Sequence, residues 1–262
     1  MRRALSPVLL LGSLASPAAA QRLNYAPLSD EEPVLTWQQA EAPTSTGPRL
    51  HYALLDRLEW APQSGRDSYS WDFSALWGSD RDGVWLSSVG EGGLWSRPDY
   101  IEAQALYSRT VAEGVYLNAG LRWDAKPAPQ RFYFTAGGQY ERTWGENDLW
   151  LGGFGSLSHE GELSARLGGI YNHRLLPRLY AQPSFELNAS AEDVQELGLG
   201  RGLSYAELGL RLRYEVAQGF APYVGVSWER ALGRTADYAR AAGENPEAKS
   251  VVIGLRYYGG ED

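Results

Sequence analysis

The chain has 262 residues, no cysteine and a single methionine, which is residue 1. Its 24 Lys and Arg residues against 32 Asp and Glu give a formal net charge of −8, which disfavours nucleic acid as a partner because phosphate binding needs a basic surface. The missing cysteines exclude a disulfide-stapled fold and a thiolate metal site. The 10 Trp, 16 Tyr and 30 Gly are typical of a transmembrane β-barrel, which needs aromatic residues at both membrane interfaces and glycine at turns.

Residues 1–20 have the pattern of a cleaved signal peptide. Arg2 and Arg3 precede an apolar stretch around residues 8–11, and the segment ends in three alanines at 18–20. This order of basic, apolar and small residues predicts export from the cytoplasm. Removal of the segment leaves 22 basic against 32 acidic residues, a net charge of −10. After it, no window approaches the ~20 consecutive apolar residues of a spanning helix.

Residues 21–49 are polar, contain several prolines and lack periodicity, which predicts a flexible periplasmic tail. This tail contains neither His nor Met. It therefore offers no imidazole or thioether ligand to a metal ion.

From about residue 50 to the end, apolar residues alternate with small or charged ones. In residues 207–216, one face carries Leu208, Leu210, Leu212, Tyr214 and Val216, and the other carries Glu207, Gly209, Arg211, Arg213 and Glu215. A period of two indicates a strand, whereas a helix would mix the two sets. Twelve such runs lie near 50–60, 68–78, 83–91, 100–110, 114–124, 130–142, 147–157, 162–174, 178–188, 203–216, 220–230 and 249–259. They predict an all-β fold, an antiparallel transmembrane β-barrel of about twelve strands over residues 50–262.

The lengths of the connections predict the orientation of this barrel. Links after the even-numbered runs are short, and most links after the odd-numbered runs are longer. Outer-membrane barrels have short periplasmic turns and longer external loops, so we expect both termini in the periplasm. Pro183 lies inside the ninth run, where it cannot donate a ladder hydrogen bond, and it predicts a β-bulge.

Charged residues on the inward face are the first candidates for a functional site. They are Glu59, Glu102, Asp124, Glu186, Glu207, Arg211, Arg213, Glu215, Glu229 and Arg256, together with Arg57, Arg122 and Arg166. A twelve-strand lumen is partly occluded, so opposite charges are expected to pair across it. The same carboxylates can offer weak, exchangeable oxygen sites to a cation. These two interpretations are compatible.

The three histidines are the only candidate nitrogen ligands. His159 lies in a predicted external loop, and His173 lies near the other end of the same strand, tens of ångströms away at ~3.3 Å per residue. His51 begins the first strand, on roughly the opposite wall. We therefore expect them not to share an ion. Aromatic residues near strand ends are expected to anchor the barrel at the membrane interfaces: Trp60, Trp71, Trp77, Trp123, Tyr214 and Trp228.

A long block of the sequence resembles a known family. Residues 202–244 read GLSYAELGLRLRYEVAQGFAPYVGVSWERALGRTADYARAAGE and closely resemble the bacterial copper resistance protein B family of outer-membrane proteins. Further matching segments are LDRLEW (55–60), ALWGSDRDGVWL (75–86), EAQALYSR (102–109) and YAQPSFELN (180–188). The resemblance implies an outer-membrane barrel that takes part in copper tolerance, with the copper ion as its ligand and periplasmic copper-handling proteins as partners.

Members of that family commonly carry a periplasmic segment rich in Met and His, which this tail lacks. Copper(I) prefers sulfur ligands and copper(II) prefers imidazole with oxygen partners. The sequence therefore favours transient copper binding or passage across the outer membrane, not high-affinity storage. Two alternatives stay open: a nonspecific channel or structural barrel, and a lipid hydrolase that would use Ser156 or Ser158 with His159. No further catalytic motif accompanies that group, so we expect no enzyme activity.

Overall fold

The computed structural model describes residues 48–62 and 67–259 of the chain. The predicted signal peptide (1–20), the predicted tail up to residue 47 and the last three residues (260–262) lie outside the described residues. Within the described part, regular structure consists almost entirely of strands.

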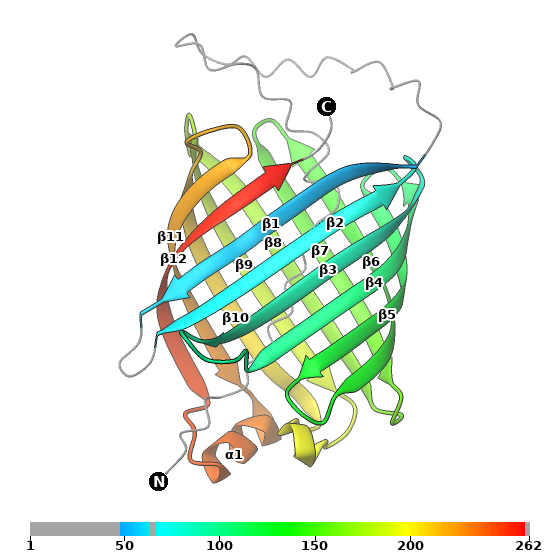
Figure 1. Ribbon diagram of the computed structural model, residues 1–262, viewed down its shortest axis with the longest axis vertical. Coiled ribbons are helices and arrows are strands. Elements are labelled where there is room, and N and C mark those ends of the chain that lie inside the picture. Colours follow the sequence, from blue (N-terminus) through cyan, green and yellow to red (C-terminus); the bar gives the residue numbers. More distant parts are fainter. Residues whose placement is uncertain (1–47, 63–66, 260–262) are drawn as a thin grey trace.

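Twelve antiparallel strands close into a barrel, as the alternation predicts (Figure 1). The strands are β1 (Arg49–Ala61), β2 (Ser68–Gly78), β3 (Asp82–Gly93), β4 (Tyr100–Ala112), β5 (Val115–Lys126), β6 (Arg131–Trp144), β7 (Asn147–Ser158), β8 (Leu163–Leu176), β9 (Leu179–Ser190), β10 (Gly202–Tyr214), β11 (Phe220–Ala231) and β12 (Glu247–Gly259). Each strand pairs with its neighbours in sequence, and β1 pairs with β12, from Ala53↔Gly259 to Trp60↔Ile253. This last pairing leaves no free edge.

The two ends of the barrel differ. The turn end carries the short links 79–81, 113–114, 145–146, 177–178 and 215–219, together with the described ends of β1 and β12. The loop end carries the two longest links, 191–201 and 232–246. Those links contain the 3-10 helix η1 (Gln195–Leu197) and the helix α1 (Gly233–Ala241), which Figure 1 shows at one end of the barrel. In the described part of the chain, neither helix is long and apolar enough to cross a membrane.

Helix α1 was not predicted from the sequence. The alternation stops before it, and its nine residues read as a polar loop. Tertiary contacts hold it in place: the hydroxyl of buried Thr235 accepts a hydrogen bond from the backbone N–H of Gly200 at 2.9 Å, and Arg234 forms an ion pair with Asp193 at 3.1 Å. The two long loops are thereby joined to each other.

Burial is inverted relative to a soluble protein. On β10, Leu208 and Leu210 are exposed on the outer face, at 53% and 46%, whereas Glu207 and Arg211 are buried in the lumen. Hydrocarbon on the outside and polar partners on the inside favour this arrangement. Four of the six predicted interface aromatics are exposed, namely Trp60, Trp77, Trp123 and Tyr214, whereas Trp71 and Trp228 are half-buried.

The predicted bulge at Pro183 is wrong. Leu210 on β10 pairs directly with Pro183. On the other side, the pairs Ile170↔Ser184 and His173↔Ala181 are separated by equal numbers of residues on the two strands, so the register runs through without a shift. The strand accommodates the missing N–H without an extra residue.

A bulge does occur in β1. The register of β1 shifts between Leu55 and Arg57 against β2, and between Leu55 and Leu58 against β12. Both Asp56 and Arg57 therefore contact lumen partners: Asp56 accepts from Arg256 at 2.9 Å, and Arg57 lies 3.7 Å from Asp72. Simple alternation would have placed Asp56 on the outer face.

A cluster of charged residues at the loop end connects the link between β7 and β8 to neighbouring elements. Glu162 accepts hydrogen bonds from Arg131 Nε at 3.0 Å and from the Ser158 hydroxyl at 2.7 Å. Arg131 also donates to Glu196, in η1, at 2.7 Å. Burial favours the neutral acid, but the hydrogen bonds from Arg131 and Ser158 outweigh it and lower the pKa of Glu162.

Replacing Glu162 with Gln should destabilise the barrel at neutral pH by about 1–2 kcal/mol, since hydrogen bonds to a charged acceptor are lost. Because the pKa of Glu162 is lowered on folding, its contribution is present above the ordinary glutamate pKa and disappears as the pH falls through the lowered value. Urea unfolding of the wild type and the variant, followed by tryptophan fluorescence, should show that the difference in their unfolding free energies decreases at acidic pH. The exposed Glu160→Gln is the control, and an equal loss in both variants would contradict the role of Glu162.

Candidate functional site

Three carboxylates lie side by side on the lumen wall. Glu207 on β10 is directly opposite Glu186 on β9 and directly opposite Glu229 on β11. We call these three residues the acidic row. Neighbouring strands are only ~4.8 Å apart, and like charges that face each other across a ladder are destabilising. Such a row needs cations nearby.

Protein cations neutralise the acidic row only in part. Arg166 lies 3.6 Å from Glu186, and Arg57 lies 3.8 Å from Glu207, both longer than a charge-assisted hydrogen bond. Glu229 accepts a long hydrogen bond of 3.4 Å from the Ser227 hydroxyl. Glu186 also accepts a hydrogen bond from the Asn188 amide at 2.7 Å. Among the described residues, the row thus has polar partners but no short ion pair with an arginine.

A cavity of about 170 Å³ adjoins the acidic row, and we call it the chamber. Seven charged residues line it: Glu59, Glu91, Asp99, Glu207 and Glu229, with Arg57 and Arg211. Arg211 is already engaged, since its Nε donates to Glu59 at 2.6 Å. The lining of the chamber thus contains five carboxyl groups and two arginines.

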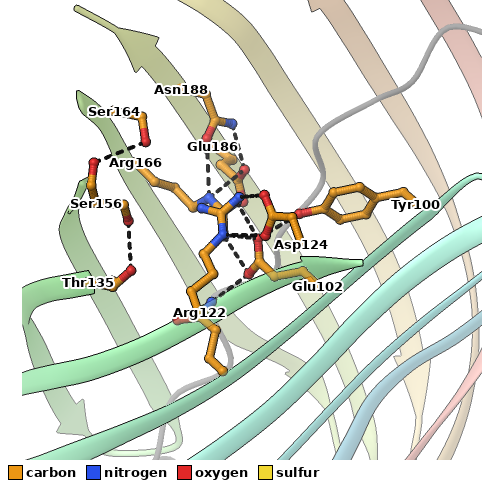
Figure 2. A network of polar contacts seen from close by, with 11 residues as sticks. Tyr100, Glu102, Arg122, Asp124, Thr135, Ser156, Ser164, Arg166, Glu186 and Asn188 are labelled. Carbon is orange, nitrogen blue, oxygen red and sulfur yellow. Dashed lines mark hydrogen bonds and ion pairs between the residues drawn. The ribbon is translucent and has the colours of Figure 1, made fainter. Parts of the chain in front are cut away.

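A second carboxylate cluster, shown in Figure 2, is fully paired. Both Arg122 and Arg166 contact Glu102, at 2.9 and 3.0 Å, and the Tyr100 hydroxyl donates to the same carboxylate at 2.6 Å. Arg122 also holds Asp124 through two hydrogen bonds of 2.7 Å. We call this group the central ion cluster. Both carboxylates of the cluster are in direct contact with an arginine, and Glu102 is contacted by two, so we assign the cluster a structural role.

The remaining predicted lumen residues lie toward the turn end. Arg213 donates to Asn172 at 3.1 Å and lies over the Tyr180 ring, 5.4 Å from its centroid. Arg256 donates to Asp56, and Glu215 follows the last residue of β10. The ten predicted lumen residues are thus divided among three places, and Glu215 is not part of the acidic row.

The three histidines lie apart. His51 near the start of β1 lies 2.9 Å from the Gly78 carbonyl, at the turn end. His173 lies on β8 beside Asn147, and its ring stacks on Tyr171. His159 lies at the loop end, where its Nδ1 accepts from the backbone N–H of Phe132. Within the described residues, no group of three or more His, Asp or Glu side chains is arranged to hold a metal ion.

The serines near His159 have other partners. The Ser156 hydroxyl lies 2.9 Å from that of Thr135 in the lumen, and Ser158 donates to Glu162. The His159 ring lies edge-on to Phe132 and 3.4 Å from Glu160. This arrangement is not that of a nucleophile and its base.

Several lumen carboxylates escaped the sequence analysis, namely Asp56, Asp72, Glu91 and Asp148. Asp72 lies between Trp71 and the exposed Phe73, so the alternation of apolar and polar residues could have placed it on the lumen face. Glu91 lies in a glycine-rich segment that shows no alternation, and Asp56 is turned inward only by the bulge.

Removing one carboxylate of the central ion cluster should be costly. Glu102→Gln leaves the buried guanidinium of Arg166 with only the longer contact to Glu186 and the hydrogen bond to Asn188. We expect a loss of about 3 kcal/mol in unfolding free energy. The control is Glu196→Gln, because Glu196 is largely exposed and surface pairs contribute under ~1 kcal/mol. Equal unfolding midpoints for the two variants would contradict this assignment.

Comparisons with known proteins agree with the barrel and the earlier resemblance. The model of the copper resistance protein B precursor family matches residues 49–258. The chain is 34% identical to copper resistance protein B of Escherichia coli, over 90% of this chain and 84% of that protein. It is 33% identical to a copper resistance protein B homolog of Pseudomonas syringae pv. tomato, over 95% and 83%.

Among solved structures, the NanC porin superposes with a TM-score of 0.51 at 13% identity, over 77% of this chain and 98% of that one. This likeness concerns the fold alone, and it is the fold of an outer-membrane barrel. The family match spans nearly the whole described barrel, from β1 to β12. The chain therefore belongs to the copper resistance protein B family and is an outer-membrane barrel of copper resistance.

Proposed function

We propose that the barrel serves copper tolerance by holding copper ions transiently at the acidic row, as a step of binding or passage at the outer membrane. The partly neutralised row of Glu186, Glu207 and Glu229 beside the chamber carries this proposal. Like charges that face each other in register reduce stability. The presence of the acidic row therefore suggests a functional role for the electrostatic field of its carboxylates. No catalytic step is involved.

The available ligand atoms indicate weak, exchangeable binding. The chain has no Cys, its only Met is residue 1, and the three His are spread over both ends of the barrel. Copper(I) prefers sulfur, whereas copper(II) accepts oxygen and imidazole ligands. Carboxylates of the lumen therefore favour copper(II), held loosely enough to leave again.

The barrel's asymmetry supports an orientation. Outer-membrane barrels have short turns on the periplasmic side and longer loops outside. On this rule the turn end, with both described chain ends, faces the periplasm, and the loop end with α1 faces the medium. A periplasmic copper-binding protein would then meet the turn end and supply the Met- and His-rich ligand set that residues 21–49 do not contain.

The double variant Glu207→Gln/Glu229→Gln tests the site. It should weaken copper(II) binding to the purified, tag-free barrel by about tenfold, which corresponds to ~1.4 kcal/mol. Because it also relieves the repulsion of facing charges, the unfolding midpoint should stay unchanged or rise. Isothermal titration measures the first quantity and urea unfolding the second.

The control is Glu192→Gln/Glu196→Gln, two carboxylates of the exposed loop-end link. In a strain without the chromosomal gene, the control should restore copper tolerance and the lumen variant should not. Full restoration by the lumen variant, or unchanged copper affinity, would refute the proposal.

A pull-down from copper-grown cells tests the partner. With the barrel solubilised from its membrane, a periplasmic copper-binding protein should be recovered together with it, and the recovery should fall when the turn-end links 79–81 and 145–146 are replaced by Gly-Ser sequences. Recovery of no periplasmic copper protein would argue against this partner.

A further inference from the structure

Toward the turn end, the lumen contains a layer of buried apolar side chains that the sequence analysis did not predict. The layer consists of Tyr52, Leu54, Leu76, Trp85, Leu106, Trp150 and Phe154. We call it the turn-end layer. Its members lie in the turn-end half of their strands or, for Leu106 and Phe154, near the middle of β4 and β7. All are between 0% and 8% exposed, so neither water nor lipid reaches them freely.

The turn-end layer reaches across the lumen. Trp85 on β3 and Phe154 on β7 stack with ring centroids 6.5 Å apart, although three strands separate β3 from β7 in the barrel order. Ile170 on β8 and Tyr258 on β12 pack against the same layer. The apolar contact therefore extends from β12 through β1 to β4 and across to β7 and β8.

Polar side chains fill the remaining sectors at this level. Asn118 on β5 and Gln139 on β6 are both 3% exposed, and Gln139 accepts a hydrogen bond from the Trp150 indole at 3.1 Å. Gln182, Arg213 and Tyr223, from β9, β10 and β11, are also buried. Each wall of the barrel thus sends a buried side chain into this part of the lumen.

Two glycines fix the aromatic rings in place. A Cβ at Gly152 would come 2.5 Å from the Trp150 ring, and one at Gly137 would come 2.6 Å from the Phe154 ring. The wall is therefore recessed where the rings lie, and they sit against the backbone. This close approach makes the layer a packed structure and not a loose constriction.

We propose that the lumen is a blind chamber: cations reach the acidic row from the loop end, and the turn-end layer bars them from the other end. The chamber extends to the loop-end rim, because it is lined by Ala61, Ser68 and Gly93, the terminal residues of β1, β2 and β3 there. A hydrated ion would have to shed water to enter the layer, which is costly without compensating ligands. Cations as occupants rest on the proposed function, whereas the closure rests on packing alone. Of the two routes in that function, the closure favours transient binding over passage through the lumen.

Ion conductance in planar lipid bilayers tests the closure. The wild-type barrel in KCl should show little or no conductance. Trp85→Ala/Phe154→Ala removes the pair that bridges the lumen and should raise the single-channel conductance at least fivefold. The matched control is Trp123→Ala/Phe132→Ala, a stacked pair on the outer face with centroids 5.9 Å apart, which should leave the conductance at the wild-type level.

Folding of each variant is checked by its heat-modifiable mobility on gels, and Leu106→Ala, which removes less volume, should give a smaller rise if the double variant does not fold. A wild-type barrel that by itself conducts ions freely in KCl would overturn the blind chamber, even if no variant folds. That result would leave the copper affinity of the acidic row untouched. Conversely, unchanged copper affinity in Glu207→Gln/Glu229→Gln would refute the proposed function and leave the closure standing.

Discussion

Closure of β1 on β12 is the constraint on which the other features of this barrel depend. It satisfies the backbone of both strands within a hydrocarbon environment, where an unpaired N–H or C=O costs several kcal/mol. Once the sheet is closed, alternation sends every second residue to lipid and the rest to the lumen. Twelve strands enclose more space than eight, which side chains just fill, and less than the sixteen of an open porin. The lumen must therefore be partly packed and partly wet.

Different kinds of side chain occupy the lumen at different levels along the barrel axis. The turn-end layer packs aromatic and aliphatic side chains across part of the lumen, and the central ion cluster satisfies Glu102 with two arginines. The acidic row has only longer contacts to Arg57 and Arg166. Since the chain pairs Glu102 so completely, the weak pairing of the row is not explained by a lack of arginines in the lumen. The difference identifies the row, among the predicted carboxylates, as the set with free capacity.

The alternation in the sequence predicted the strands and the face that most side chains occupy. It did not predict contacts that depend on the position of a residue along the barrel axis or on the register between strands. The twelve strands, their order and most inward-facing charges follow from a period of two. Trp85 and Trp123 look alike in sequence, yet one closes the lumen and the other faces outward, because each follows the parity of its own strand. Which carboxylates meet is set by the pairing of β9, β10 and β11, which no single strand encodes. Asp56 turns inward through a bulge, and α1 forms through contacts between loops.

A weak oxygen site is compatible with copper as its cargo. Among divalent first-row metals, copper(II) binds a given set of nitrogen, oxygen or sulfur ligands more tightly than its neighbours, including zinc. Under the proposed function, an acidic row without sulfur would therefore still favour copper(II) over zinc or nickel at equal concentration, although it would hold none of them strongly. In a chamber closed at one end, such a site fills and empties with the concentration of the ion at its open end. Selectivity can then come from the metal's own chemistry, while the barrel supplies the negative field and controls access to it.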